Sequence, residues 1–206
     1  MIKNILWDFD GVILDSMPIR DYGFRKIFED FNTEDVDRIL DYHKQNGGLS
    51  RYVKIRYFYE NILNKDINDD EINIYAEQFS MIMKRELINR KYLIGDSVEF
   101  IKNHYKKYNF HIVSGSDEKE LKYLCKQLDI KDYFISINGS PTHKNDLVKN
   151  LLEKYNYNKN ETILIGDSMN DYSAAKINSL DFYGYNNIEL KIYSKRYLDD
   201  YRELIV

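Results

Sequence analysis

The sequence predicts an α/β fold in which a parallel sheet carries a small helical bundle inserted after its first strand. From residue 93 onward, short apolar runs alternate with helical segments, a pattern typical of parallel strands joined by right-handed helical crossovers. Between the first apolar run and residue 93, apolar residues recur only at helical spacing. We therefore expect a core of residues 1–15 and 93–206 and a helical insertion of residues 16–92.

The first predicted strand, residues 5–7, ends in two carboxylates, Asp8 and Asp10, which are followed at once by Gly11. Successive strand residues point to opposite faces, so the chain must bend after Asp8 before both acids can enter one cleft. Gly11 permits such a bend. Taken alone, this segment is also explained as a strand followed by an acidic turn.

Four short amphipathic helices are predicted in the insertion. Their apolar faces are Phe24, Ile27, Phe28 and Phe31 in the first, Val36, Ile39, Leu40 and His43 in the second, Tyr52, Ile55, Tyr59 and Ile62 in the third, and Ile72, Tyr75, Ala76, Phe79 and Met83 in the fourth. We expect the second, third and fourth helices to be capped by Thr33, by Ser50, and by Asp69 or Asn68. Helices of this kind form a small bundle.

Four further strands are predicted in the second part of the chain, at residues 110–113, 134–137, 162–165 and 180–183. Capping residues predict helices that begin at Asp96 and at Asp117, and apolar spacing predicts a helix over residues 144–155. Another helix is predicted through Ala174. A C-terminal helix is predicted to carry Leu198, Tyr201 and Ile205.

The composition points to small ligands. The net charge of −4 and the pI near 5.6 argue against non-specific binding to nucleic acid or to an anionic membrane. The run before Asp8 is too short for a secretory signal and no stretch is long enough to span a membrane, so we expect a cytoplasmic protein. The single cysteine, Cys125, excludes an internal disulfide and is expected to be buried.

Chemically active residues lie at the ends of several predicted strands or in the loops that follow them. They are Asp8 and Asp10, residues 114–116, Lys144, and Asp167 with Asp171. Because the carboxyl ends of parallel strands meet at one edge of the sheet, these residues are expected to converge. Clustered carboxylates with a lysine and a hydroxyl suit a hard cation such as Mg²⁺ and a phosphate group, and the metal offsets the repulsion between the acids.

These residues carry a family resemblance. Asp8-x-Asp10-Gly-Val, the strand-ending Ser114, Lys144, and Gly166-Asp167-Ser168-x-x-Asp171 resemble the four ordered motifs of the haloacid-dehalogenase-like superfamily. The resemblance implies a Rossmann-like core, a Mg²⁺ cofactor and a covalent aspartyl-phosphate. It also implies that residues 16–92 form a mobile helical cap over the site.

By this resemblance Asp8 is the nucleophile, and Asp10 protonates the leaving oxygen and later deprotonates the attacking water. Ser114 and the backbone N–H groups around Gly115 bind the transferring oxygens, while Lys144 balances negative charge.

The same resemblance assigns the metal ligands. They are the Asp8 side chain, the Asp10 backbone carbonyl and Asp167. Asp171 either ligates, through water, or orients the others.

The cap segment Gly48-Leu49-Ser50-Arg51 resembles that of the branch containing β-phosphoglucomutase and phosphoglycolate phosphatase. In that branch a cap arginine reaches the non-reacting part of the substrate, often a second anionic group, so Arg51 is a candidate for substrate binding. A surface arginine at a helix start explains the residue equally well.

The sequence thus predicts a Mg²⁺-dependent phosphatase that acts on a small phosphorylated metabolite, such as a sugar phosphate or phosphoglycolate. A phosphosugar mutase and a catalytically retired binding module are the alternatives. Asp10 argues against dehalogenation, which needs no acid for a leaving oxygen. Cleavage of a phosphonate through a cap lysine is disfavoured, because Lys54, Lys65 and Lys84 are expected to be solvated on surface helices.

Overall fold

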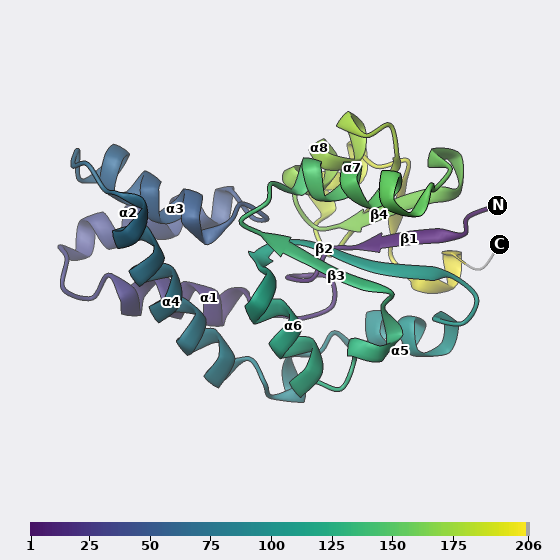
Figure 1. Cartoon of the computed structure of the whole chain (residues 1–206), viewed down its shortest axis with the longest axis horizontal. Coiled ribbons are helices and arrows are strands. Elements are labelled where there is room, and N and C mark those ends of the chain that lie inside the picture. Colours follow the sequence, from purple (N-terminus) through teal and green to yellow (C-terminus); the bar gives the residue numbers. More distant parts are fainter. Residues whose placement is uncertain (205–206) are drawn as a thin grey trace.

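A six-stranded parallel sheet forms the core of the protein, in the computed structural model that describes residues 1–204 (Figure 1). The strand order is β3-β2-β1-β4-β5-β6. The strands are β1 (Asn4–Trp7), β2 (Asn109–Asp117), β3 (Ser136–Ser140), β4 (Thr162–Gly166), β5 (Asp181–Tyr185) and β6 (Arg196–Leu198). The predicted α/β, Rossmann-like fold is confirmed.

Strand β1 lies in the middle of the sheet and is buried on both faces. Ile5 and Trp7 pack into one hydrophobic cluster, whereas the intervening Leu6 packs into another. Helices α5 (Gly95–His104) and α6 (Glu118–Gln127) cover the first face. Helices α7 (Lys144–Tyr155) and α8 (Met169–Ile177) cover the second, above the sheet in Figure 1. These two layers fix the central strand and the site at its end.

The helices between residues 16 and 92, which we call the cap, form a bundle beside one end of the sheet, at the left of Figure 1. It contains α1 (Met17–Ile27), α2 (Thr33–Gln45), α3 (Arg51–Tyr57) with a π-helical turn over Phe58–Ile62, and α4 (Asp69–Glu86). Aromatic rings fill its centre, with ring centroids of Phe28 and Phe58 4.0 Å apart.

Two adjacent segments connect the cap to the core. Leu14 forms an antiparallel bridge with Leu93, and the N–H of Asp15 donates to the carbonyl of Tyr92 at 2.8 Å. We retain the boundaries after residue 15 and before residue 93 as a proposal.

Most predicted caps are confirmed: Ser50, Asn68 and Asp117 each accept a hydrogen bond from a backbone N–H in the first turn. The prediction for Thr33 is one residue late, because Asn32 accepts from the N–H of Glu34. The capping box at Asp96 is wrong, since α5 begins at Gly95 without a side-chain cap.

Other boundaries also differ from the prediction: β2 runs on to Asp117 and β5 to Tyr185. Helix α1 ends at Ile27, so Phe31 lies beyond it, and β3 runs over Ser136–Ser140 instead of residues 134–137. The shift arises because Ser136 pairs with His111 of β2, which places Phe134 before the strand.

The predicted C-terminal helix is wrong. Leu198 ends strand β6, which supplies backbone partners for β5, and Tyr201 lies in a 3₁₀ turn over Tyr201–Leu204. The Tyr201 ring packs 5.5 Å from that of Trp7. The predicted helix position Ile205 lies outside the described residues. In residues 1–204 no helix is both long enough and apolar enough to cross a membrane.

Candidate active site

Three carboxylates meet at the carboxyl ends of β1 and β4. Asp8, Asp167 and Asp171 each place one oxygen within 4.8 Å of the other two. The N–H of Asp8 donates to the carbonyl of Ile165 at 2.9 Å, so the β1–β4 ladder holds Asp8 at the sheet edge. Gly11, with φ +75°, lies so close to this cluster that a Cβ there would be 1.9 Å from Asp167 Oδ2. The predicted convergence of Asp8 with Asp167 and Asp171 is therefore present.

Burial, and after it the repulsion between the acids, sets the electrostatics of this cluster. Burial raises the pKa of Asp8 to about 7, with a further contribution from the charge of Asp171 and an opposing one from Lys144. Burial and the charges of Asp8 and Asp171 raise the pKa of Asp167 well above its ordinary value. Buried oxygen ligands that resist simultaneous ionisation fit a hard divalent cation, so the residues present suit Mg²⁺.

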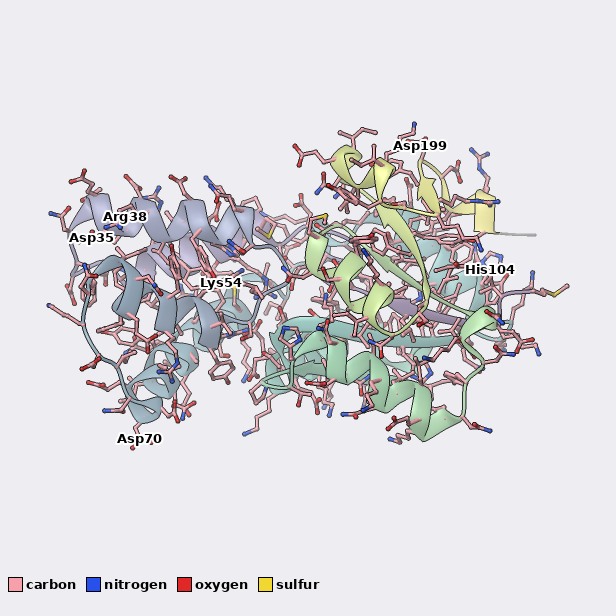
Figure 2. The ribbon with its side chains drawn as sticks, turned by 90° about the horizontal axis from the view of Figure 1, so that it is seen from above. Asp35, Arg38, Lys54, Asp70, His104 and Asp199 are labelled. Carbon is pink, nitrogen blue, oxygen red and sulfur yellow. The ribbon has the colours of Figure 1, made fainter. Side chains whose placement is uncertain are left out.

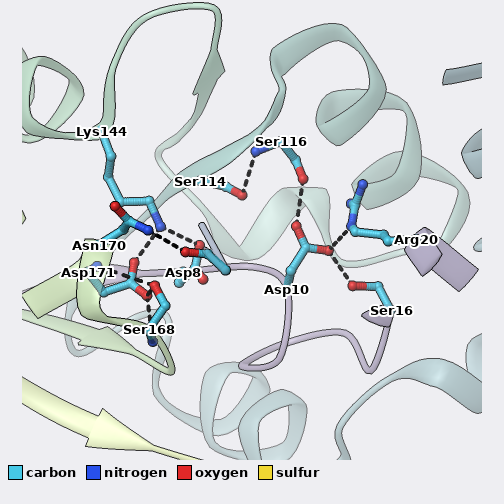
Figure 3. A network of polar contacts seen from close by, with 11 residues as sticks. Asp8, Asp10, Ser16, Arg20, Ser114, Ser116, Lys144, Ser168, Asn170 and Asp171 are labelled. Carbon is cyan, nitrogen blue, oxygen red and sulfur yellow. Dashed lines mark hydrogen bonds and ion pairs between the residues drawn. The ribbon is translucent and has the colours of Figure 1, made fainter. Parts of the chain in front are cut away.

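Lys144, the first residue of α7, links two of these acids (Figure 3). Its Nζ lies 2.8 Å from Asp8 Oδ1 and also pairs with Asp171 Oδ1. Burial would lower the pKa of Lys144, but Asp171 and Asp8 hold it above its ordinary value. The other oxygen of Asp171 accepts from the N–H of Ser168 at 3.0 Å. Protein groups therefore engage both oxygens of Asp171.

Asp10 points away from the carboxylate cluster, as Figure 3 shows. Its Oδ1 accepts from Ser16 and from Arg20 Nε, the latter at 2.6 Å, and its Oδ2 accepts from Ser116 Oγ at 2.6 Å. Burial would raise the pKa of Asp10, but the charge of Arg20 and the two hydroxyls lower it below its ordinary value. Asp8 and Asp10, the two candidate catalytic acids, therefore lie in environments that shift their pKa values in opposite directions.

The candidate phosphate-binding segment lies in the last part of β2. Ser114 is buried, and its Oγ accepts from the N–H of Ser116 at 3.1 Å. A Cβ on Gly115 would lie 2.0 Å from the carbonyl oxygen of Gly48, a cap residue. Only glycine permits this approach, so Gly115 allows the cap to contact the core at this point.

A cavity of about 40 Å³ lies between the cap and the core. Its walls are Asp8, Asp10, Ser114, Gly115 and Ser116 from the core and Met17, Arg20, Phe24, His43, Gly48, Leu49, Arg51, Lys54 and Phe79 from the cap.

Arg51 forms part of the cap wall and is buried, so the surface interpretation of this residue is wrong. Its Nη1 lies 2.6 Å from Glu120 Oε2 and 2.7 Å from Ser80 Oγ. Its guanidinium carbon stands 4.6 Å from the centre of the Phe79 ring. These contacts hold Arg51 against the cavity.

Lys54 was expected on a solvated surface, and that expectation is wrong. Figure 2 shows it within the helical bundle, and it is 3% exposed. Its Nζ lies 2.7 Å from His43 Nδ1, and burial, with the charge of Arg20, lowers its pKa to about 7. Lys65 is exposed as expected, and Lys84 is half-buried with its Nζ over the Tyr123 ring.

Ser116 belongs to the predicted segment 114–116, whereas Arg20 and Glu120 join the site without having been predicted. Arg20 shares helical spacing with the buried Phe24 and Ile27, so a charged residue on an apolar face was the available signal. Glu120 carries no comparable signal, because its two arginine partners come from distant parts of the chain.

Comparisons with known proteins agree with this architecture. The sequence model of the haloacid dehalogenase-like hydrolases matches residues 5–184. A phosphoglycolate phosphatase of Vibrio vulnificus (strain CMCP6) is 27% identical over 211 residues, covering 91% of this chain and 87% of that protein.

Two solved structures share the fold. β-Phosphoglucomutase from Clostridium difficile aligns with a TM-score of 0.75 at 19% identity, over 99% of this chain and 93% of that one. The putative hydrolase YfnB from Bacillus subtilis, bound to magnesium, aligns with a TM-score of 0.72 at 16% identity, over 98% and 96%.

Proposed function

This chain belongs to the haloacid dehalogenase-like hydrolase family, and we propose that it is a Mg²⁺-dependent phosphatase that hydrolyses a small phosphorylated metabolite through an aspartyl-phosphate on Asp8. The substrate is of the sugar phosphate or phosphoglycolate type. The family and the phosphoglycolate phosphatase relative support an enzyme that acts on small phosphate esters.

The observation that carries this proposal is the arrangement around Asp8. A buried lysine pairs with Asp8 on one side, and Asp10 stands apart in a hydrogen-bonded setting of its own. Two carboxylates in different environments serve the two roles that the reaction needs, a nucleophile and an acid–base group.

In the proposed reaction, an Asp8 oxygen attacks phosphorus in line and the substrate oxygen departs. Asp10 gives that oxygen a proton and then takes one from the water that hydrolyses the aspartyl-phosphate. Ser114 and the N–H groups around Gly115 donate to the transferring oxygens. Lys144 balances the charge gathered on Asp8 and the phosphoryl group.

The Mg²⁺ ligands that we propose are the Asp8 side chain, the Asp10 backbone carbonyl and Asp167. When bound, the metal supplies positive charge to the acidic cluster and to the transferring group. Because Lys144 and Ser168 engage both oxygens of Asp171, we assign Asp171 to orienting the site.

We further propose that the cap opens and closes about its two connecting segments, to admit substrate and exclude bulk water. The magnesium-bound Bacillus subtilis structure reveals interdomain movement in a protein of the same fold, which supports this proposal.

The test is a panel of small phosphate esters incubated with the protein and Mg²⁺, with released inorganic phosphate measured. We expect release from at least one member, and none from an Asp8→Asn variant whose circular dichroism matches that of the wild type. Conversion of a sugar phosphate to its isomer without phosphate release would instead support the mutase. Binding of phosphate esters without turnover would support the retired binding module.

A further inference from the structure

Two arginines of the cavity wall have their charges matched by carboxylates of the core. Arg20 Nε lies 2.6 Å from Asp10 Oδ1, and Arg20 Nη1 lies 3.2 Å from Glu120 Oε1. Arg51 Nη1 lies 2.6 Å from the other oxygen, Glu120 Oε2. One glutamate thus bridges two cap helices, and two carboxylates balance the two guanidinium charges.

Glu120 stands behind these arginines and does not line the cavity itself. It belongs to the first turn of α6, where its N–H donates to the capping carboxylate of Asp117 at 3.0 Å, and its side chain is fully buried. The core therefore places a fixed negative charge beneath the cap wall. The Glu120 charge contacts the two cap arginines because the cap packs against the core in this structure.

The two arginines of the wall retain hydrogen-bond donors although carboxylates compensate their charges. Among the described residues, Arg20 Nη2 and Arg51 Nη2 have no hydrogen-bond partner. Lys54, the remaining basic side chain of the wall, is directed at His43. Donors on balanced ion pairs suit uncharged oxygen atoms such as hydroxyls, whereas an added anion would face Asp10 directly and would meet arginines whose charge Glu120 already compensates from behind.

We propose that Glu120 determines substrate specificity by keeping Arg20 and Arg51 in balanced ion pairs, so that the enzyme favours phosphate monoesters whose remaining part is uncharged and hydroxylated. The negative charge of Glu120 disfavours substrates that carry a second anionic group. This inference rests on the proposed function, since it concerns the non-reacting end of that reaction's substrate. It narrows the substrate class from phosphoglycolate-like compounds to phosphorylated alcohols and sugars.

The wild-type enzyme provides the first test. Phosphoglycolate and 2-hydroxyethyl phosphate have nearly the same length and differ in a distal carboxylate against a hydroxyl. We expect kcat/KM, from phosphate release with Mg²⁺, to be at least about tenfold higher for 2-hydroxyethyl phosphate. Equal values, or a preference for phosphoglycolate, would overturn the inference while leaving the phosphatase assignment intact. No release from these or any other phosphate ester would instead remove the proposed function, and this inference with it.

The variant Glu120→Gln tests the residue itself, because the amide keeps the shape of the side chain and removes its charge. We expect the ratio of kcat/KM values to move about tenfold towards phosphoglycolate. Glu118→Gln is the matched control, since it removes the same charge from the same helix turn at a surface position paired with Lys122, and its ratio should stay at the wild-type value.

A different outcome would show that Glu120 has only a structural role. If Glu120→Gln lowers kcat/KM equally for both substrates, or more for phosphoglycolate, the glutamate only positions the arginines and the proposal is refuted. Thermal unfolding followed by circular dichroism checks that the variant is folded. Should it not fold, the wild-type comparison decides alone.

Discussion

Replacing the buried Lys54 by methionine should stabilise the protein, and most strongly at low pH. Lys54 is 3% exposed. Its ammonium group contacts His43 of α2 and feels the charges of Arg20, Asp10, Arg51 and Asp21. Burial is the largest cause that lowers its pKa, from 10.5 to about 7. Methionine has a similar length and carries no charge to bury.

The magnitude follows from the difference between the folded and unfolded states. A pKa lowered from 10.5 to about 7 corresponds to about 5 kcal/mol of destabilisation by the charged form. The lost contact with His43 Nδ1 offsets about 1–3 kcal/mol of the gain, which leaves a net stabilisation of about 2–4 kcal/mol below about pH 7. Between the two pKa values the unfolded chain binds more protons, so wild-type stability rises with pH and the advantage of the variant shrinks.

Urea unfolding followed by circular dichroism measures this effect. The difference in unfolding free energy between Lys54→Met and the wild type should fall by about 2.5 kcal/mol from about pH 6 to about pH 9. Lys65→Met removes an exposed lysine of the cap and serves as the control, with no such change. A difference for Lys54→Met that is the same at both pH values would refute the buried charge.

Three further predictions concern the site. Lys144→Ala should raise the activation free energy by several kcal/mol and so lower kcat, because a positioned cation is lost. Wild-type kinetics in this variant would show that Lys144 does not contact the phosphoryl group. Chelation should abolish phosphate release, Mg²⁺ should restore it and Ca²⁺ should inhibit, because its coordination is larger and looser; unchanged rates in excess chelator would contradict the metal site. Arg51→Ala should lower kcat/KM for the physiological substrate and leave a small aryl phosphate nearly untouched, whereas equal losses would indicate a structural role.

The sequence was sufficient to predict the sheet and the residues at its edge. Ile5, Leu6 and Trp7 form a short apolar run, and a parallel sheet brings the ends of such runs together whatever their separation in the chain. For this reason the sequence alone groups Asp8 with Lys144 and Asp167.

The cap wall could not be predicted in the same way. Lys54 and Arg20 belong to helices whose charged residues are ordinarily solvated, and they are buried here because the cavity wall surrounds them. Glu120, the partner of Arg20, lies 100 residues away. Pairing of this kind depends on how two separate units pack, which local periodicity does not encode.

The C-terminal error has a related cause. Leu198 and Tyr201 are three residues apart, a spacing that fits a helix face. In the structure, however, Leu198 belongs to the strand that pairs with β5, and the Tyr201 ring packs against Trp7. These tertiary contacts outweigh a weak local pattern.

The central claim is a covalent phosphoryl group on Asp8, and mass analysis of acid-quenched enzyme tests it most directly. Enzyme stopped during turnover of a substrate with Mg²⁺ should gain the mass of one phosphoryl group, located by proteolysis to the peptide that contains Asp8. An Asp8→Asn variant treated identically should gain none. A phosphoryl group on another residue, or full turnover by Asp8→Asn, would contradict the account.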